Sequence, residues 1–329
     1  MTHQVLITTD YLQRGDAVDR YLHDRGFETI HAPLQGRREP EELISLLNGI
    51  DGAIIANEPM RADVLSSAPT LKAVVRSGVG YDSVDVAAAS DLGILVSNLP
   101  GINANAVAEF TMGVILSSSR RLIELATGVA EGRWPRTDGH ELRGSTLGLL
   151  GFGAAARAVV PLARAFGMTV LCRTGIEPGV RPAASEVEFV DLDTLLTRSD
   201  FLSIHTALNA STHHMIDARA LRLMKPTATL INTARGAIVD EADLVMAVRE
   251  GVIAGAALDV CEVEPLPPDS ALRDVAGITV YSHMAGQTVE AREAAGREAA
   301  VELVNSLAGR PAFRVNDPAM RQFRVPLRR

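Results

Sequence analysis

The stretch Thr146-Leu-Gly-Leu-Leu-Gly151-Phe-Gly153-Ala-Ala-Ala156-Arg-Ala-Val joins an apolar run to an amphipathic helical pattern through a glycine-rich turn. Gly151 permits a tight turn after the predicted strand, and Gly153 lets the backbone approach a pyrophosphate where the helix begins. Glycines alone are weak evidence, but the strand and the helix on either side are the context that a dinucleotide-binding turn requires. We therefore expect a dinucleotide to bind against Gly151, Gly153, Ala154 and Ala155.

Short apolar runs alternate with helical patterns on both sides of this turn. The first series occupies residues 5–8, 52–56, 73–76 and 94–97, and the second occupies residues 146–150, 169–172, 201–205, 228–232, 256–260 and 278–281. Strands that alternate with helices predict βαβ units and parallel sheets with right-handed crossovers. Two such series predict an α/β protein with two doubly wound parallel-sheet domains.

Two longer helical patterns, at residues 104–125 and 289–307, bear on where the domains divide. After the second pattern only residues 313–316 remain to add to a sheet, so we expect the end of the chain to return to the first domain. The predicted cofactor domain therefore comprises residues 99–289. The other domain is discontinuous and comprises residues 1–98 and 290–329.

The composition limits the classes of partner. The 329 residues are 47% hydrophobic and 22% charged, which suits two domains that each bury a core. The formal net charge of −8 argues against nucleic acid, because its binding needs a basic face. The longest apolar stretch, around residues 104–117, contains Glu109 and is shorter than the ~20 residues of a membrane span. We expect neither nucleic acid nor a membrane as a partner.

The cellular location follows from the N-terminus and the cysteines. The opening residues 1–12 lack a basic region followed by a long apolar core, so they predict a first strand and no signal peptide. Cys172 and Cys261 form no CxxC pair, which favours buried, reduced thiols. We expect a cytoplasmic protein, whose arginine-rich tail after Asn316 is solvated or loosely docked.

Three polar side chains each follow a strand-like run in the second series: Arg235, Glu264 and His283. The carboxyl ends of parallel strands open onto one crevice, so the three are expected to share a site. A guanidinium can bind both oxygens of a carboxylate, an imidazole can donate a proton, and a carboxylate beside the ring orients and charges it. The alternative is that Arg235 forms a loop salt bridge and Glu264 is a solvated charge.

The end of the second strand of the cofactor domain bears on the choice of cofactor. An acid for the adenosine ribose is expected there, ~20 residues beyond the glycine turn, but the sequence reads Cys172-Arg173-Thr174-Gly175. A guanidinium and a hydroxyl suit a 2′-phosphate better than a free hydroxyl. We expect NADPH to be used at least as well as NADH, unless Arg173 is merely a surface residue beside an indifferent ribose site.

From residue 76 to residue 316 the chain resembles the D-isomer-specific 2-hydroxyacid dehydrogenases, and within them the phosphoglycerate dehydrogenase-like group. The resemblance is carried by the glycine turn together with residues 76–82, 98–103, 108–109, 232–236, 259–265 and 282–283. It implies a Rossmann cofactor domain inserted into a discontinuous flavodoxin-like substrate domain. It also implies NAD or NADP as cofactor and a homodimer built on the cofactor domain.

The resemblance also implies roles for individual residues. The catalytic arginine, glutamate and histidine of the family fall on Arg235, Glu264 and His283. The backbone at Gly78, Val79 and Gly80 is expected to hold the carboxylate of the substrate, and Asp259 to meet the nicotinamide carboxamide. Further cofactor contacts are expected at Arg173, Thr174, Thr206, Ala207, Thr212, Thr233, Ala234, His283, Ala285 and Gly286.

Other residues of the resemblance receive weaker roles. Ala154 stands where the family often has an arginine, so one pyrophosphate contact is missing. His205 is expected to pack near the cofactor, and Trp134 to lie in a loop or in the dimer contact. The adjacent His213 and His214 would diverge and make a poor metal pair, so no metal is expected.

The expected reaction is reversible hydride transfer between NAD(P) and a small anionic D-2-hydroxy acid or 2-oxo acid. The phosphoglycerate dehydrogenase-like pattern is the nearest, with glyoxylate or hydroxypyruvate reduction as the alternative and phosphite a remoter one. A hypothesis of another class is a corepressor-like protein that senses the dinucleotide and has no significant turnover.

Overall fold

The computed structural model describes residues 3–33, 39–176 and 187–316, and these form two compact units. The first unit contains the described residues up to Asn103 and from Thr288 onward, and the second runs from Ala104 to Gln287. These divisions lie a few residues from the predicted ones at 98/99 and 289/290. The arginine-rich tail after residue 316 lies outside the described residues.

The first unit is built on a parallel five-stranded sheet. Its strands are β1 (His3–Ile7), β2 (Phe27–His31), β3 (Gly52–Ile55), β4 (Ala73–Arg76) and β5 (Leu95–Ser97), in the order β2-β1-β3-β4-β5. This is the flavodoxin-like strand order, in which the chain starts near the middle and winds to both sides.

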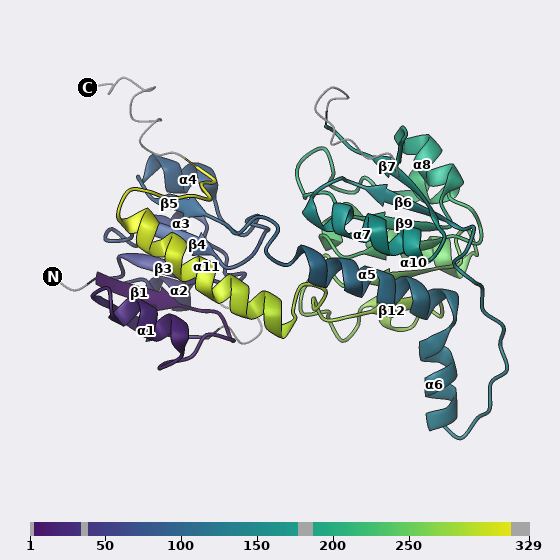
Figure 1. Cartoon of the computed structure of the whole chain (residues 1–329), viewed down its shortest axis with the longest axis horizontal. Coiled ribbons are helices and arrows are strands. Elements are labelled where there is room, and N and C mark those ends of the chain that lie inside the picture. Colours follow the sequence, from purple (N-terminus) through teal and green to yellow (C-terminus); the bar gives the residue numbers. More distant parts are fainter. Residues whose placement is uncertain (1–2, 34–38, 177–186, 317–329) are drawn as a thin grey trace. The chain divides into compact units, whose positions relative to one another are not determined.

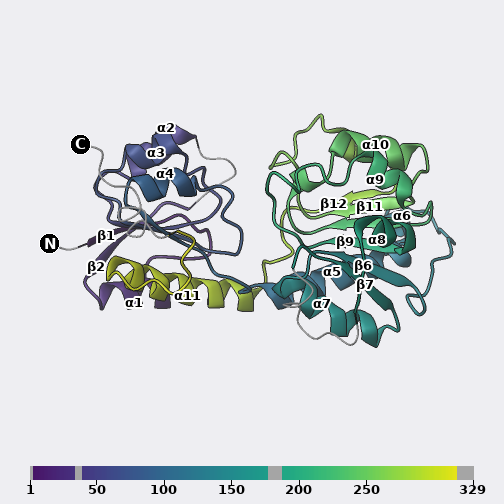
Figure 2. The ribbon, with the colours of Figure 1, turned by 90° about the horizontal axis from the view of Figure 1, so that it is seen from above.

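Helices cover both faces of this sheet, as Figure 2 shows. One layer contains α1 (Ala17–His23) and α11 (Val289–Leu307), and the other contains α2 (Pro40–Leu46), α3 (Ala62–Ser66) and α4 (Val86–Asp91). The strands bury side chains on both faces of the sheet. In β1, for example, Val5 and Ile7 pack with the first layer and Leu6 packs with the second. The predicted helix at residues 289–307 is confirmed as α11.

Buried polar side chains hold the end of the described chain against the first unit. Asn316 accepts a hydrogen bond from the Val96 N–H group (2.8 Å) and donates to the Ile94 carbonyl (2.9 Å). The Glu302 carboxylate accepts the N–H group of Phe313 at 3.2 Å. Residues 313–316 add no full strand, since they pair with β5 only through an antiparallel bridge between Arg314 and Ser97.

The second unit is built on a parallel seven-stranded sheet. Its strands are β6 (Thr146–Leu150), β7 (Thr169–Arg173), β8 (Glu188–Phe189), β9 (Phe201–Ile204), β10 (Thr229–Asn232), β11 (Gly255–Leu258) and β12 (Ile278–Val280). The order β12-β11-β10-β9-β6-β7-β8 is that of a Rossmann sheet with a seventh strand at one edge. The chain is therefore an α/β protein with two doubly wound parallel sheets, as predicted.

Helices also cover both faces of the second sheet (Figure 2). On one face lie α5 (Ala104–Ser119) and α7 (Ala154–Ala165), and on the other lie α8 (Leu192–Arg198), α9 (Ala218–Leu223) and α10 (Glu241–Arg249). None of the helices in the described ranges has the length and apolar character needed to cross a bilayer.

The predicted helix at residues 104–125 is confirmed over residues 104–119, but the prediction of a single unbroken helix is wrong. Arg121 adopts a left-handed conformation (φ 52°), which ends the course of α5 and starts α6 (Leu122–Ala130) in a new direction. Figure 1 shows α6 projecting away from the body of its unit. Leu122 and Val129 are 50% and 51% exposed on it.

Candidate functional site

The candidate site of the second unit is formed by loops at one edge of its sheet. Because the strands are parallel, the segments that follow β6, β7, β9, β10, β11 and β12 all emerge at their carboxyl ends. The sequence-predicted residues 151–155, 173–174, 206–212, 233–235, 259–264 and 283–286 lie in these segments or at the end of the strand before them. The fold therefore brings them to one edge.

Gly151 makes the first of these loops possible. Its φ of 106° is rarely open to residues with a side chain, and a Cβ atom there would lie 2.6 Å from the His205 carbonyl oxygen. The Gly151 N–H group donates to the Arg173 carbonyl at 2.8 Å. The turn thus lies tightly between the ends of β7 and β9.

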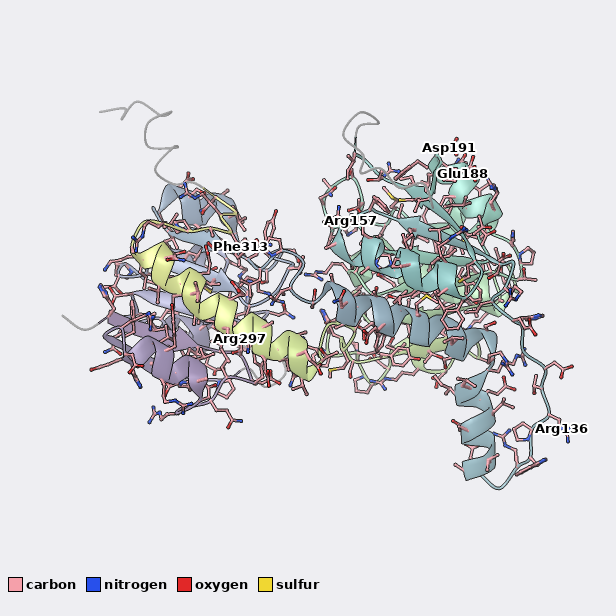
Figure 3. All side chains as sticks on the ribbon, in the orientation of Figure 1. Arg136, Arg157, Glu188, Asp191, Arg297 and Phe313 are labelled. Carbon is pink, nitrogen blue, oxygen red and sulfur yellow. The ribbon has the colours of Figure 1, made fainter. Side chains whose placement is uncertain are left out.

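Gly153 instead leaves open space in front of α7. It is the N-cap residue, it makes no side-chain capping hydrogen bond, and a Cβ atom built on it meets no heavy atom within 4 Å. Such a cradle, which a side chain would fill, fits a pyrophosphate bound at the N-terminus of the helix. Arg157, one turn beyond Ala154, is exposed and adds a positive charge to this turn (Figure 3).

The end of β7 carries Arg173 and Thr174, both half-buried. The Thr174 hydroxyl accepts a hydrogen bond from the Ile176 N–H group at 3.2 Å, and Arg173 forms no ion pair within residues 3–33, 39–176 and 187–316.

The loop after β9 carries Thr212, which is buried. Its hydroxyl donates to the Ala207 carbonyl at 2.8 Å. The Thr212 hydroxyl thus shapes its own loop.

Thr233 carries a polar atom that the described part of the chain leaves unsatisfied. Its Oγ1 atom is buried without a hydrogen-bond partner there. Buried polar groups are normally paired, and an exception at a strand end is typical of a ligand-binding position. The observation fits the expected cofactor contact at this residue.

Asn232 fixes the loop that carries Arg235, and the motif reading assigned it no role. Its side chain donates to the Arg235 carbonyl (2.8 Å) and accepts the Ala234 N–H group (3.0 Å). The Arg235 guanidinium donates to the Ala234 carbonyl at 2.7 Å. The sequence signal for this role is a buried Asn at the end of a strand, three residues before Arg235.

Gly236 brings the loops of Arg235 and Glu264 into backbone contact. A Cβ atom at this position would overlap the carbonyl group of Cys261 and the nitrogen of Glu262. Only glycine permits this approach, because the atoms on the other side belong to the backbone and cannot rotate away. The sequence reading also missed this role.

Glu264 and His283 form a direct hydrogen bond. The Nδ1 atom of His283 lies 2.7 Å from Oε2 of Glu264, while Oε1 of Glu264 accepts the Cys261 N–H group at 3.0 Å. The His283 and Glu264 side chains are 32% and 36% exposed. The pair is therefore held by the backbone on one side and open to solvent on the other.

The pKa of Glu264 reflects these neighbours. Burial acts to raise it, but the hydrogen bond to His283, its charge, the Cys261 N–H group and the charge of Arg235 together hold the pKa below its ordinary value. Glu264 is thus an anion at neutral pH, and the charges of Arg235 and His283 both act on it. The structure brings the three residues of the predicted triad together.

Asp259 positions the backbone around His283. Its buried carboxylate accepts the N–H groups of Met284 and Ala285, both at 2.8 Å, and its carbonyl accepts the N–H group of His283 at 2.8 Å. These bonds hold His283 in a left-handed conformation (φ 58°). Burial raises the pKa of Asp259 despite the two N–H donors.

In the part of the chain that the structure describes, the remaining histidines and cysteines form no metal-ligating cluster. His205 is desolvated, which lowers its pKa to about 4 and keeps it neutral. Cys172 in β7 and Cys261 after β11 are both free and buried. Within the described ranges no group of three or more His, Cys, Asp or Glu side chains is arranged to hold a metal ion.

The first unit carries the predicted loop of Gly78, Val79 and Gly80 after β4. The Gly78 N–H group already donates to the Arg76 carbonyl at 2.8 Å, and the Arg76 guanidinium packs against Gly78. The Val79 carbonyl accepts a hydrogen bond from the Asn98 side chain at 2.7 Å. Of the three N–H groups, those of Val79 and Gly80 make no hydrogen bond that the described residues show.

Comparison with known proteins places these features in a known family. Residues 112–285 match the family model for the D-isomer specific 2-hydroxyacid dehydrogenase, NAD binding domain. A glyoxylate reductase of Thermofilum pendens is 40% identical over 278 residues, which cover 82% of this chain and 82% of that protein.

Two further proteins bear on substrate and cofactor. A D-3-phosphoglycerate dehydrogenase of Methanocaldococcus jannaschii is 37% identical over 282 residues, which cover 84% of this chain but 53% of that protein. The crystal structure of an NADPH-dependent glyoxylate/hydroxypyruvate reductase from Sinorhizobium meliloti, in complex with NADP and malonate, matches with a TM-score of 0.84 and 28% identity. That match covers 96% of this chain and 97% of the other.

Proposed function

The chain belongs to the D-isomer specific 2-hydroxyacid dehydrogenase family, and we infer that it reduces a small 2-oxo acid, glyoxylate or hydroxypyruvate, with NADPH as the preferred cofactor. The family establishes an NAD(P)-dependent oxidoreductase of 2-hydroxy acids. The observation that carries the proposal is the 2.7 Å hydrogen bond between His283 and Glu264 at the sheet edge that also bears the glycine turn and Arg235.

Two similarities support the small substrate. Several glyoxylate and hydroxypyruvate reductases match this chain over most of their own length. The phosphoglycerate dehydrogenase of M. jannaschii matches over only 53% of its length. The phosphoglycerate dehydrogenase-like activity is therefore the less favoured of the two.

In the proposed mechanism, Arg235 binds the carboxylate of the substrate through its planar guanidinium. His283 donates a proton to the carbonyl oxygen as negative charge grows there, and its positive charge stabilises that oxygen. Glu264 accepts the Nδ1 hydrogen of His283, which orients the ring and presents Nε2 to the substrate. The N–H groups of Val79 and Gly80, in the loop after β4 of the first unit, are proposed to bind a carboxylate, with Gly78 supplying the turn.

A nicotinamide cofactor, when bound, supplies the hydride. The residues proposed to hold it fit this role: the open space at Gly153 and the first turn of α7 would receive the pyrophosphate, and the Thr233 hydroxyl, which has no hydrogen-bond partner within the described residues, would bind a polar group of the cofactor. Asp259 acts on the nicotinamide side, where it also holds the backbone of Met284 and Ala285. Thr206, Ala207, Thr212, Ala234 and Gly286 complete the set.

The preference for NADPH rests on Arg173 and Thr174. No acidic side chain follows β7 within the described residues up to 176, and the Arg173 guanidinium has no ion-pair partner in them. A free guanidinium beside a hydroxyl binds a 2′-phosphate by charge-assisted hydrogen bonds.

The proposed homodimer uses α6 and the loop that follows it. Leu122, Ile123 and Val129 are 50%, 44% and 51% exposed, and Trp134 is 77% exposed. A group of exposed large apolar side chains on a projecting helix is typical of a protein interface. Sedimentation of Trp134→Ala tests this role, because a dimer that depends on Trp134 should dissociate at a higher concentration than the wild type.

The proposed function is tested by a panel of initial-rate assays. Glyoxylate, hydroxypyruvate, phosphohydroxypyruvate and a bulkier 2-oxo acid are each supplied with NADH and with NADPH. We expect the highest kcat/KM for glyoxylate or hydroxypyruvate with NADPH, and its loss in Arg235→Ala. If neither cofactor is oxidised with any acid, the protein is a dinucleotide-binding module; if Arg235→Ala retains activity on every acid, the carboxylate clamp is wrong.

A further inference from the structure

His214 connects the loops that follow β9, β10 and β11. Its backbone N–H group donates to the Ala237 carbonyl at 2.9 Å, two residues beyond Arg235. Its ring lies between two carboxylates, with Nδ1 3.3 Å from Oδ2 of Asp240 and Nε2 3.1 Å from Oε1 of Glu262. Glu262 precedes Glu264 by two residues, so His214 contacts the loops of Arg235 and Glu264, two of the three loops that carry the triad.

The charge state of the ring decides whether both contacts hold. A neutral imidazole has one donor and one acceptor, whereas an imidazolium has two donors. Two carboxylates facing the two ring nitrogens are therefore both satisfied only when His214 is protonated.

The groups around the ring are predominantly acidic. Besides Asp240 and Glu262, Glu241 exchanges hydrogen bonds with Glu262: each accepts the other's N–H group, at 2.6 and 3.2 Å. Burial, together with the charges of Glu262, Glu264 and Asp240, raises the pKa of Glu241. Within the described residues, His213 also contacts the ring, stacked on it with ring centroids 4.0 Å apart.

The backbone at His214 also favours a dedicated role. Its φ of 48° is left-handed, which costs a non-glycine residue about 1–2 kcal/mol. The bonds to Ala237, Asp240 and Glu262 hold the residue in this conformation. The side chain is 34% exposed, so its proton exchanges with solvent.

We propose that His214 is a positioning residue whose protonated ring ties Glu262 to Asp240 and thereby keeps the Glu264 loop against the Arg235 loop. This proposal concerns the same site as the proposed function, and its test by activity rests on that function. When the ring loses its proton, one of the two contacts loses its donor, and the Glu264 loop is held less firmly. Reduction of the 2-oxo acid should then slow with rising pH for a second reason besides the proton of His283.

Three variants separate the donor from the charge. His214→Ala removes both contacts, whereas His214→Gln keeps an uncharged donor that reaches toward Glu262 as Nε2 does. Both place a non-glycine residue at the same φ, so their comparison cancels the backbone cost. His213→Gln is the control, because His213 is exposed and contacts the ring only by stacking.

The activity readout is the pH profile of kcat/KM for glyoxylate reduction. We expect His214→Ala to lower kcat/KM by about 10- to 100-fold at pH 6, since displaced catalytic groups cost this much. His214→Gln, which keeps only the contact to Glu262, should lie between the wild type and His214→Ala at pH 6 and lose the steeper part of the alkaline decline, while His213→Gln keeps the wild-type profile. If His214→Ala matches the wild type, or if His214→Gln keeps the steep decline, the proposal is wrong.

A readout without turnover separates this proposal from the proposed function. Amide hydrogen exchange of residues 259–266 reports how firmly the Glu264 loop is held. After correction for intrinsic rates, protection of this segment at pH 6 should be lower in His214→Ala than in the wild type and unchanged in His213→Gln. This result supports the positioning role even in a protein that oxidises no cofactor, whereas equal protection in the wild type and His214→Ala overturns it.

Discussion

The Nδ1 atom of His283 lies 2.7 Å from the Oε2 atom of Glu264, although 18 residues separate them in the chain. The bond joins the loop after β11 to the loop after β12, and it leaves Nε2 of the ring free to act on a substrate. Because Glu264 is also held by the Cys261 N–H group, the carboxylate has little freedom to turn away. The charge of Glu264 and its position therefore act separately on His283, and substitutions can distinguish the two effects.

Glu264→Gln removes the charge and keeps the shape. We expect kcat for reduction to fall by about 10²-fold, because the charged ring loses its stabilising partner. The alkaline limb of the pH profile should move to lower pH for the same reason. Glu250→Gln, an exposed glutamate at the end of α10, is the matched control and should behave like the wild type. An unchanged profile in Glu264→Gln would remove Glu264 from the mechanism.

Acid pH should reveal the lowered pKa of Glu264. Its folded-state pKa lies below the ordinary value of 4.5, so the ionised carboxylate stabilises the fold above pH 4.5. This stabilisation should be lost as the pH falls through the lowered value. Urea unfolding at pH 7 and at successively lower pH is expected to show the wild type losing its advantage over Glu264→Gln. A difference that stays constant with pH would contradict the assignment.

Gly236→Ala tests the backbone contact between the Arg235 and Glu264 loops. The added methyl group overlaps the backbone of Cys261, so the loops must move apart. We expect a loss of about 1–3 kcal/mol in the free energy of unfolding and a fall in kcat/KM of at least about 100-fold. Gly113→Ala in α5 is the control, since its methyl group meets open space and helix propensity favours it. Equal behaviour of the two variants would show that the contact is unimportant.

The two glycines of the turn should separate folding from cofactor binding. Gly153→Ala meets no atom within 4 Å, so the melting temperature should stay near that of the wild type while KM for the cofactor rises by about 10-fold or more. Gly151→Ala has a positive φ and overlaps the His205 carbonyl, so it should lower the melting temperature. If Gly153→Ala binds the cofactor as tightly as the wild type, the pyrophosphate does not lie at this turn.

Arg173→Ala should change the choice between the two cofactors. Removal of the guanidinium should raise KM for NADPH by about 10-fold and leave KM for NADH within about twofold, because charge-assisted bonds to a phosphate are worth roughly 1.5–3 kcal/mol. Arg198→Ala is a control, since Arg198 already pairs with Glu188 at 2.7 Å. A wild type that strongly prefers NADH would contradict the expectation at the outset.

Much of the fold follows from the sequence because buried strands and capped helices leave local patterns. The Ala- and Glu-rich pattern at residues 289–307 predicts α11, whose start is capped by the Thr288 side chain. The strands β2 and β8 were missed because both lie at sheet edges and carry polar residues such as Glu28 and Glu188. The break between α5 and α6 depends on the left-handed Arg121, which no glycine or proline marks.

The sequence predicts the principal residues of the candidate site, but it does not predict the residues that support them. Arg235, Glu264 and His283 stand out because charges at the ends of buried strands need a reason. The roles of Asn232, Gly236 and His214 depend on contacts between loops that are distant in the chain. A sequence pattern carries no distances, so these residues emerge only from the structure.

The central claim is that His283 donates the proton that accompanies the hydride. The most direct measurement is kcat for glyoxylate reduction by the wild type and by His283→Asn, with cofactor binding measured separately by fluorescence. We predict measurable turnover by the wild type, a fall of about 10²- to 10⁴-fold in the variant, and unchanged cofactor affinity. A variant that keeps the wild-type kcat would contradict the account.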